Sequence, residues 1–311
     1  MQLATFTLTD EDPATARIGV VIDDSIVDLH IAERHFGEHD RNRIPPDMIA
    51  LLGAPRETRA LAGELARQAQ TDASLRIQLS DCRLLAPVPR PNTIRDCATY
   101  IKHAKSGISN LGVSSADSDV WQRLPAYYKG NPMSVIGTGQ DVLWPSFSQQ
   151  IDFELELGIF IGRAGKNISL DDAPSYIAGY TLFNDVSARD QQGEEMKLTL
   201  GPTKGKDFDT GNPIGPWIVA GALLDERSLA YTISVNGEEW TRGTMANQYW
   251  TFAELIAYVS RDETLHPGDF IAAGCVDGGC GLDLGRFPEP GDEISFTVEG
   301  IGTLTNRFVK P

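Results

Sequence analysis

Ile151-Asp-Phe-Glu-Leu-Glu-Leu-Gly-Ile-Phe-Ile161 alternates apolar and acidic residues over its first half. A period of two is typical of a β-strand, because successive side chains point to opposite faces. Asp152, Glu154 and Glu156 therefore share one face, where neighbouring acids lie about 6.8 Å apart. Like charges at this spacing repel unless water or a cation screens them. The pattern favours a metal site over a solvated strand face, because the same face continues with glycine and phenylalanine.

A second strand carrying an acid is predicted by the apolar run of residues 179–186, which includes Asp185. A hard divalent cation needs several oxygen ligands held on rigid elements, and two neighbouring strands supply them. We therefore expect Asp185 to join the acids of the first strand at one cation site.

The overall composition is typical of a soluble enzyme. The chain has 311 residues, of which 41% are hydrophobic, so it can bury a sizeable core. Its formal net charge of −16 argues against nucleic acid and anionic membrane surfaces as partners. A small anionic substrate stays compatible, because local cations can override the global charge. The first residues carry neither a basic segment nor an apolar one, which predicts a cytoplasmic protein.

Four cysteines, at positions 82, 97, 275 and 280, are too few and too unevenly spaced for a disulfide scaffold. We therefore expect reduced thiols. Cys275 and Cys280 resemble half of a zinc site, but no second pair of Cys or His residues follows at ligand spacing. The sequence thus predicts no zinc site.

Three alternating prolines in residues 83–91 indicate an extended connector between two domains. Residues 1–86 are expected to form a small α+β domain. Residues 87–311 contain many short strands and few helices, with hairpin signals such as Asn-Gly at 236–237. We expect an α+β, mainly β fold whose larger domain is a mixed, largely antiparallel β-roll.

Other catalytic signatures are absent from the sequence. Residues 201–206 resemble a phosphate-binding loop, but the glycine spacing is one residue short. There is no nucleophile elbow, paired-histidine zinc helix or dinucleotide fingerprint. No cofactor beyond a metal ion is indicated.

Four ordered blocks of the chain resemble the fumarylacetoacetate hydrolase family. They read Asp-Phe-Glu-Leu-Glu-Leu-Gly (152–158), Gly-Tyr-Thr-Leu-Phe-Asn-Asp-Val-Ser-Ala-Arg-Asp (179–190), Gly-Lys-Asp-Phe-Asp-Thr (205–210) and Gly-Pro-Trp-Ile-Val (215–219). The resemblance extends from about residue 96 to residue 306. It implies the family's β-roll, and the longer members carry an N-terminal domain as well.

The resemblance places metal ligands at Glu154, Glu156 and Asp185, the same acids that the strand spacing selects. Asp96 corresponds to a further ligand of the full-length members, and Asp152 becomes a neighbour of the ligands. The metal implied is Mg²⁺, with Mn²⁺ or Ca²⁺ as alternatives.

The same resemblance makes His103, seven residues after Asp96, the catalytic base. Short members pair this histidine with a glutamate three residues later, where this chain has Ser106. The block of residues 279–284 resembles the one that supplies the carboxylate in longer members, with Asp283 in place of the usual glutamate. Aspartate is one methylene shorter than glutamate, so the contact between Asp283 and His103 requires a closer approach of the two segments.

Further residues take roles by the same resemblance. Lys206 would stabilise oxyanion charge, the alternative being a solvated lysine in a glycine-rich loop. Arg189 and Gln192 would bind the substrate's carboxylate or other oxygens. For Arg189 the alternative is a structural salt bridge to Asp190 or another acid.

Departures from the family pattern bear on the substrate. Cys275 stands where many members have a threonine near the oxyanion, either filling the space or acting as a nucleophile. Ala98 replaces an aromatic residue, whereas Tyr128 is retained as a substrate-binding residue. Fumarylacetoacetate itself is therefore not the expected substrate.

The expected activity is metal-dependent hydrolysis of a C–C bond in an anionic 1,3-diketone or acylpyruvate, in aromatic-compound breakdown by a homodimer. The metal would stabilise the enolate, and His103 with Asp283 would activate water. The alternative is a decarboxylase, tautomerase or isomerase of 2-oxo acids on the same metal site. A third hypothesis is a non-catalytic binder of small molecules.

Overall fold

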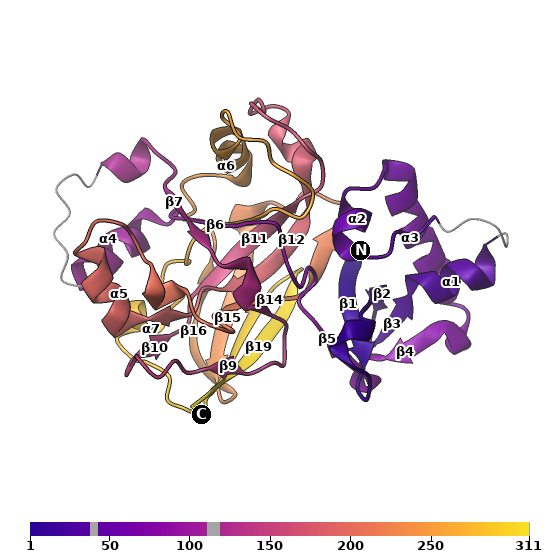
Figure 1. Ribbon diagram of the computed structural model, residues 1–311, viewed down its shortest axis with the longest axis horizontal. Coiled ribbons are helices and arrows are strands. Elements are labelled where there is room, and N and C mark those ends of the chain that lie inside the picture. Colours follow the sequence, from indigo (N-terminus) through magenta and orange to yellow (C-terminus); the bar gives the residue numbers. More distant parts are fainter. Residues whose placement is uncertain (38–42, 111–118, 311) are drawn as a thin grey trace.

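A long mixed sheet runs through the whole protein, as a computed structural model describing residues 1–37, 43–110 and 119–310 shows (Figure 1). In spatial order its strands are β4 (Arg76–Gln78), β3 (Ser25–Asp28), β2 (Arg17–Ile22), β1 (Gln2–Leu8), β14 (Asn212–Ala220), β12 (Ile177–Asn184), β11 (Leu155–Ile161), β17 (Phe270–Ala272), β6 (Ile94–Cys97) and β7 (Tyr127–Gly130). Two short strands join at the side, β5 (Cys82–Leu84) on β1 and β8 (Val135–Ile136) on β14. The expected α+β, mainly β fold is confirmed.

The N-terminal strands continue the sheet of the larger part, since β1 pairs with β14. Three helices cover them on one side, namely α1 (Leu29–Phe36), α2 (Met48–Leu52) and α3 (Arg56–Ala69) (Figure 1). The side chain of Asp28 caps α1 by accepting hydrogen bonds from two backbone N–H groups of its first turn. In α3, the residues Ala62, Leu65, Ala66 and Ala69 are buried, and their spacing places them on one face of the helix. The domain boundary after residue 86 stays a prediction.

The stretch of residues 151–161 is not one continuous strand. It divides into β10 (Ile151–Asp152), which pairs with β13 (Ser187–Ala188), and β11. Between them Glu154 makes an isolated bridge with Cys280, and its N–H donates to Asn184 Oδ1 at 3.0 Å. The strand pairing therefore changes partner where the acids lie. The solvated-face alternative is wrong, because all residues from 151 to 161 are buried.

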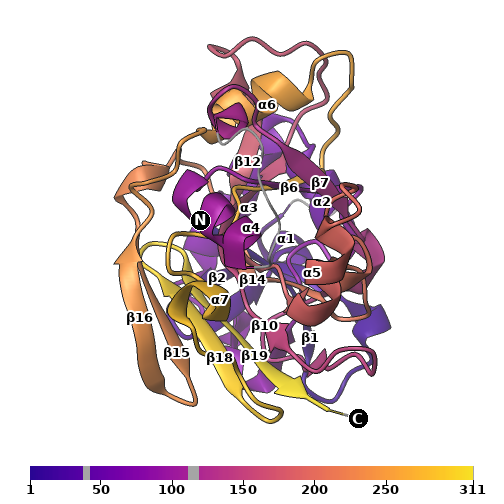
Figure 2. The ribbon, with the colours of Figure 1, turned by 90° about the vertical axis from the view of Figure 1, so that its left-hand side faces the viewer.

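A five-stranded sheet packs against the long one (Figure 2). Its order is β16 (Glu238–Thr244), β15 (Ala230–Val235), β18 (Glu293–Val298), β19 (Gly302–Val309) and β9 (Val142–Leu143). Asn236 and Gly237 connect β15 and β16 with φ values of 51° and 78°, so the predicted hairpin is confirmed. Phe153 and Phe296 pack between the sheets with ring centroids 5.8 Å apart.

Four further helices lie over the larger part. They are α4 (Ile101–Asn110), α5 (Arg189–Met196), α6 (Phe252–Val259) and the short α7 (Gly281–Leu284). Figure 2 shows α4, α5 and α7 close together at one end of the sheets. None of the helices in the described residues combines the length and the apolar character that crossing a bilayer requires.

Candidate active site

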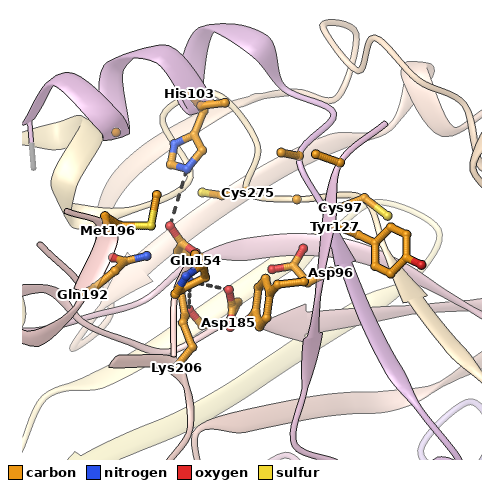
Figure 3. A pocket seen from close by; sticks show the side chains of 18 of the residues that line it. Asp96, Cys97, His103, Tyr127, Glu154, Asp185, Gln192, Met196, Lys206 and Cys275 are labelled. Atoms are coloured by element: carbon orange, nitrogen blue, oxygen red, sulfur yellow. Dashed lines mark hydrogen bonds and ion pairs between the residues drawn. The ribbon is translucent and has the colours of Figure 1, made fainter. Parts of the chain in front are cut away.

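A cavity of about 310 Å³ lies where α4, α5 and α7 meet the long sheet (Figure 3). Ten of the eleven residues assigned to the site from the sequence line this cavity: Asp96, His103, Tyr128, Glu154, Glu156, Asp185, Arg189, Gln192, Lys206 and Cys275. The eleventh, Asp283, contacts His103 from behind. The structure thus brings together residues that lie up to 187 positions apart (283 − 96).

Three of the four predicted metal ligands form a compact cluster. Carboxylate oxygens of Asp96, Glu156 and Asp185 all lie within 4.8 Å of one another, and the three residues are buried. The backbone N–H of Gly274 donates to Glu156 Oε2 at 3.0 Å, and the Tyr128 hydroxyl donates to Asp185 Oδ1 at 2.6 Å. These contacts fix the oxygens in place.

The electrostatics of this cluster favour a bound cation. Burial raises the pKa of Asp96, Glu156 and Asp185, and for the first two the neighbouring carboxylates raise it further. Asp96 Oδ1 is buried and has no hydrogen-bond partner in the part of the chain that the structure describes. A divalent cation would satisfy this oxygen and neutralise the crowded carboxylates. The donor set therefore fits a hard divalent metal.

Glu154, the fourth predicted ligand, is held differently. Its Oε1 accepts from Arg189 Nη2 at 2.7 Å, and its Oε2 forms an ion pair with Lys206. Burial alone would raise the pKa of Glu154, but the charges of Arg189 and Lys206 outweigh burial and hold that pKa well below its usual value. Glu154 is thus an ionised carboxylate that lies between two cationic side chains and the carboxylate cluster.

Lys206 is buried, so the solvated-lysine alternative does not describe it. Its ammonium group pairs with both Glu154 and Asp185 and reaches the Asp185 backbone oxygen at 3.2 Å (Figure 3). Burial would lower the pKa of Lys206, but the two carboxylates raise it. A permanent positive charge therefore lies at the floor of the cavity.

His103 and Asp283 form a hydrogen-bonded pair at the other side of the cavity. Their Nδ1 and Oδ2 atoms are 2.9 Å apart, and the Gly278 N–H donates to the same Oδ2 at 3.0 Å. His103 Nε2 points towards Glu154, with 3.5 Å between Nε2 and Oε1 (Figure 3). The shorter aspartate therefore reaches the histidine. Burial opposes protonation of His103, but Asp283 and other acceptors raise its pKa well above the usual value.

Arg189 bridges the two buried acids of the strand region. Besides Glu154, it contacts Asp152, whose Oδ1 and Oδ2 also accept the first N–H groups of α7. Arg189 Nη1 donates to Gln192 Oε1 at 2.9 Å. Asp190 instead accepts from Ser148 and Gln149. The expected alternative of a structural salt bridge therefore forms with other acids, Asp152 and Glu154. Arg189 and Gln192 still line the cavity and can contact a substrate there.

Sequence analysis missed several residues of this site. Cys280 caps α7, where its sulfur accepts from the Asp283 N–H at 3.4 Å, and it lies 3.9 Å from His103 Nδ1. Gly274, which donates to Glu156, has a φ of 91°, and a Cβ there would lie 2.2 Å from the Cys97 oxygen. An apolar wall was also missed: Trp121, Tyr127, Met196, Leu200 and Leu282. Nothing local in the sequence separates these apolar residues from core residues.

Comparisons with known proteins identify a matching family and several similar chains. Residues 93–309 match the family described as fumarylacetoacetate (FAA) hydrolase C-terminal. An oxaloacetate tautomerase of Bacillus subtilis is 33% identical, over 94% of this chain and 95% of the relative. Two solved structures are each 26% identical and covered over 100% of both chains. They are a fumarylacetoacetate hydrolase of Exiguobacterium antarcticum, with a TM-score of 0.74, and a 5-carboxymethyl-2-hydroxymuconate delta-isomerase of Mycobacterium smegmatis, with a TM-score of 0.70.

Proposed function

Because the chain belongs to the fumarylacetoacetate hydrolase family and is an enzyme of that superfamily, we propose that it interconverts the enol and keto forms of a small 2-oxo acid, such as oxaloacetate. The observation that carries this proposal over hydrolysis is the similarity to a relative of almost equal length, which is an oxaloacetate tautomerase. The His103–Asp283 pair lies across a small cavity from the carboxylate cluster and provides a group for proton transfer. The alternative that the sequence left open thus becomes the leading one.

A divalent metal bound at Asp96, Glu156 and Asp185 would act as a Lewis acid on the 2-oxo group and acidify the neighbouring C–H. Mg²⁺ is the metal we propose, with Mn²⁺ or Ca²⁺ as alternatives. Glu154 completes the negative environment from its position beside Lys206. Lys206 places positive charge near the developing oxyanion.

His103 is the group positioned to move a proton at C3 of the substrate. Asp283 holds Nδ1, so Nε2 is the nitrogen that faces the cavity beside Glu154. In the keto-to-enol direction Nε2 takes the C3 proton, and in the reverse direction it returns that proton. In the keto-to-enol direction the C2 oxygen takes a proton from solvent, and in the reverse direction it releases a proton to solvent, so the atoms balance. Arg189 and Gln192 are proposed to orient the substrate's distal carboxylate.

Hydrolysis of an acylpyruvate or 1,3-diketone remains the second candidate. The apolar wall favours it, because residues such as Trp121 and Tyr127 provide room for an acyl group that oxaloacetate lacks. The same His103–Asp283 pair would then activate water, so this pair alone does not separate the two activities. Tyr128 and Cys275 would contact the substrate in either case. Assembly as a homodimer is a further proposal, which sedimentation analysis can test.

The test measures three reactions with purified protein and Mg²⁺: enol–keto exchange of oxaloacetate, pyruvate release from oxaloacetate, and cleavage of a panel of acylpyruvates. We expect acceleration of the exchange, with His103→Ala slower by roughly 10²–10⁴-fold, the range for general acid–base catalysis. Glu226→Gln is the control, since Glu226 is a half-buried glutamate that lines a separate cavity. Cleavage of an acylpyruvate without any effect on oxaloacetate exchange would replace the tautomerase with the hydrolase.

A further inference from the structure

A second group of potential metal ligands lies next to the carboxylate cluster. Ligand atoms of His103, Glu154, Cys275 and Cys280 all lie within 4.8 Å of one another. Both cysteines are free thiols and almost fully buried. Figure 3 shows the Cys275 sulfur beside the line that joins His103 and Glu154. The four residues come from three separate regions of the chain, which is why spacing in the sequence did not reveal them.

We propose that His103, Cys275 and Cys280 form a site for a thiophilic divalent cation, Zn²⁺ or Cd²⁺, distinct from the carboxylate cluster that takes a hard cation. Thiolate and imidazole ligands select such metals, whereas clustered carboxylates suit Mg²⁺ and Mn²⁺. In a tetrahedral zinc site, ligands held about 2.3 Å from the metal lie roughly 3.8 Å apart. Because the ligand atoms of the group all lie within 4.8 Å of one another, no pair exceeds that spacing by more than about 1 Å.

The hydrogen bonds of His103 support this assignment independently of the sulfur atoms. Asp283 Oδ2 lies 2.9 Å from Nδ1, and Nε2 faces Glu154 Oε1 at 3.5 Å, while the Cys280 sulfur lies 3.9 Å from Nδ1. A carboxylate on the far nitrogen is the usual arrangement behind a zinc-bound histidine, because it fixes the ring and increases its basicity. The pair proposed above as a proton-transfer device is therefore also suited to ligation.

Glu154 is the weakest of the four ligands. Arg189 and Lys206 already occupy its oxygens, so ligation would require one of these ion pairs to open. Three ligands with a water molecule in the fourth position make a site that stays open to the cavity. Cys275, which lines that cavity, gives the cation its route of entry.

The expected consequence, which rests on the proposed function, is inhibition of the enzyme by Zn²⁺. A cation on Nε2 takes the lone pair that His103 needs to accept a proton. The enzyme would then be active with Mg²⁺ alone and inactive when Zn²⁺ occupies the second site. Cys280 lies outside the cavity lining, so its contribution is to metal selectivity and to the cap of α7.

The binding test uses Co²⁺ as a spectroscopic substitute for zinc, with the full chain kept reduced and saturated with Mg²⁺. Thiolate ligation gives an intense near-ultraviolet charge-transfer band that an oxygen-only site does not give. We expect the band in the wild type and at least tenfold weaker Co²⁺ binding in Cys280→Ser, whose hydroxyl can still cap α7. Cys82→Ser is the matched control, because Cys82 lies on β5 in the N-terminal part. A wild type without the band, or a Cys280→Ser variant that binds Co²⁺ as tightly as the wild type, overturns the site.

His103→Ala provides a second binding variant in case Cys280→Ser does not fold. Titration of the band should show at least tenfold weaker Co²⁺ binding in this variant, because it removes the only imidazole of the group. The activity arm then measures inhibition by Zn²⁺ at fixed Mg²⁺ in the wild type and in Cys280→Ser. Loss of inhibition in the variant supports the coupling to His103. A charge-transfer band without inhibition confirms the site and refutes the role of His103 in the proposed reaction, so the two failures are distinguishable.

Discussion

Glu154 and Glu156 are two residues apart, but their surroundings drive their carboxyl groups in opposite directions. Arg189 and Lys206 hold the pKa of Glu154 well below its usual value against the effect of burial. Burial together with Asp96 raises the pKa of Glu156 well above its usual value. Partner residues, and not closeness in the sequence, therefore decide the charge of each acid. One short segment provides both an ion-paired carboxylate and a carboxyl group whose charged form is disfavoured.

Glu156→Gln should weaken Mg²⁺ binding by at least about tenfold, since it removes a charged ligand from a hard cation. The carboxylate has two oxygens, one of which accepts the Gly274 N–H. The amide has a single oxygen, which cannot both accept this hydrogen bond and bind the metal as strongly as the carboxylate does. Calorimetric titration of Mg²⁺ measures the change. Glu226→Gln changes a half-buried carboxyl group in the separate cavity, so this variant should bind Mg²⁺ as the wild type does. Equal affinity in all three proteins would show that Glu156 is not a ligand.

Asp283→Asn should reduce turnover less than His103→Ala, because the amide can still hold the imidazole in place. The pH profile provides a sharper measurement than the rate. Burial lowers the pKa of His103, and the hydrogen bond to Asp283 raises it. Removing the negative charge of Asp283 should therefore shift the part of the pH–rate profile that reports the titration of His103 to lower pH. An unchanged profile would mean that Asp283 does not act through His103.

At this scale the sequence predicts residues that belong to a pattern and misses those that do not. The strand period selected Glu154 and Glu156, and the resemblance to a family supplied His103. The sequence does not connect Cys280 with His103, because their contact depends on packing between positions 177 residues apart. The assigned roles remain predictions until the variants are measured.

Among the elements, β11 is held in the long sheet by close packing across Gly158. A Cβ at this position would lie 2.2 Å from Phe270 Cζ on the neighbouring strand β17. The Phe270 ring is itself fixed between Phe160 and Phe183, with ring centroids 5.0 and 5.6 Å away. The glycine is thus required by packing, although its φ is not in the left-handed region.

Gly158→Ala should destabilise the protein by about 1–3 kcal/mol, the usual range for overpacking a core. Adding Phe270→Leu should recover part of that loss, because it opens space for the methyl group. Denaturant unfolding measures both free energies. Gly63→Ala in α3 is the control, and it should stabilise by roughly 0.5–1 kcal/mol, since its Cβ meets only Met1 Sδ at 3.7 Å. Purely additive effects of the first two substitutions would contradict direct contact.

Strands with a clear period could be predicted from the sequence, but their interruptions could not. Residues 151–161 read as one strand, whereas the chain leaves the ladder at Phe153 and Glu154 to meet Asn184 and Cys280. Similarly, residues 132–143 do not form one longer strand, but a 3₁₀ turn over Pro132–Ser134 that is followed by two short strands, β8 and β9. Contacts with distant segments decide these breaks, and local pattern carries no information about them.

For the molecule as a whole, the raised pKa values of Asp96, Glu156 and Asp185 predict stability that depends on both pH and metal. In the metal-free state the folded protein keeps protons that the unfolded chain releases above about pH 4. Its stability should therefore fall as pH rises from that value through the raised pKa values. Mg²⁺ replaces those protons, so the gain in Tm on adding Mg²⁺ should be larger at pH 8 than at pH 5. Potassium chloride at equal ionic strength is the control, and a gain independent of pH would contradict the linkage.

The pairing of β1 with β14 also sets an order of events during synthesis. The first residue donates to the Ala220 oxygen, a partner 219 positions later in the chain. At about 5–20 residues per second, a ribosome takes roughly 10–45 s to deliver that partner. During this interval the outer edge of β1 at Gln2 and Leu3 has no strand beside it and can pair with another nascent chain. Expression yield should therefore depend on chaperones that shield this edge until β14 leaves the exit tunnel.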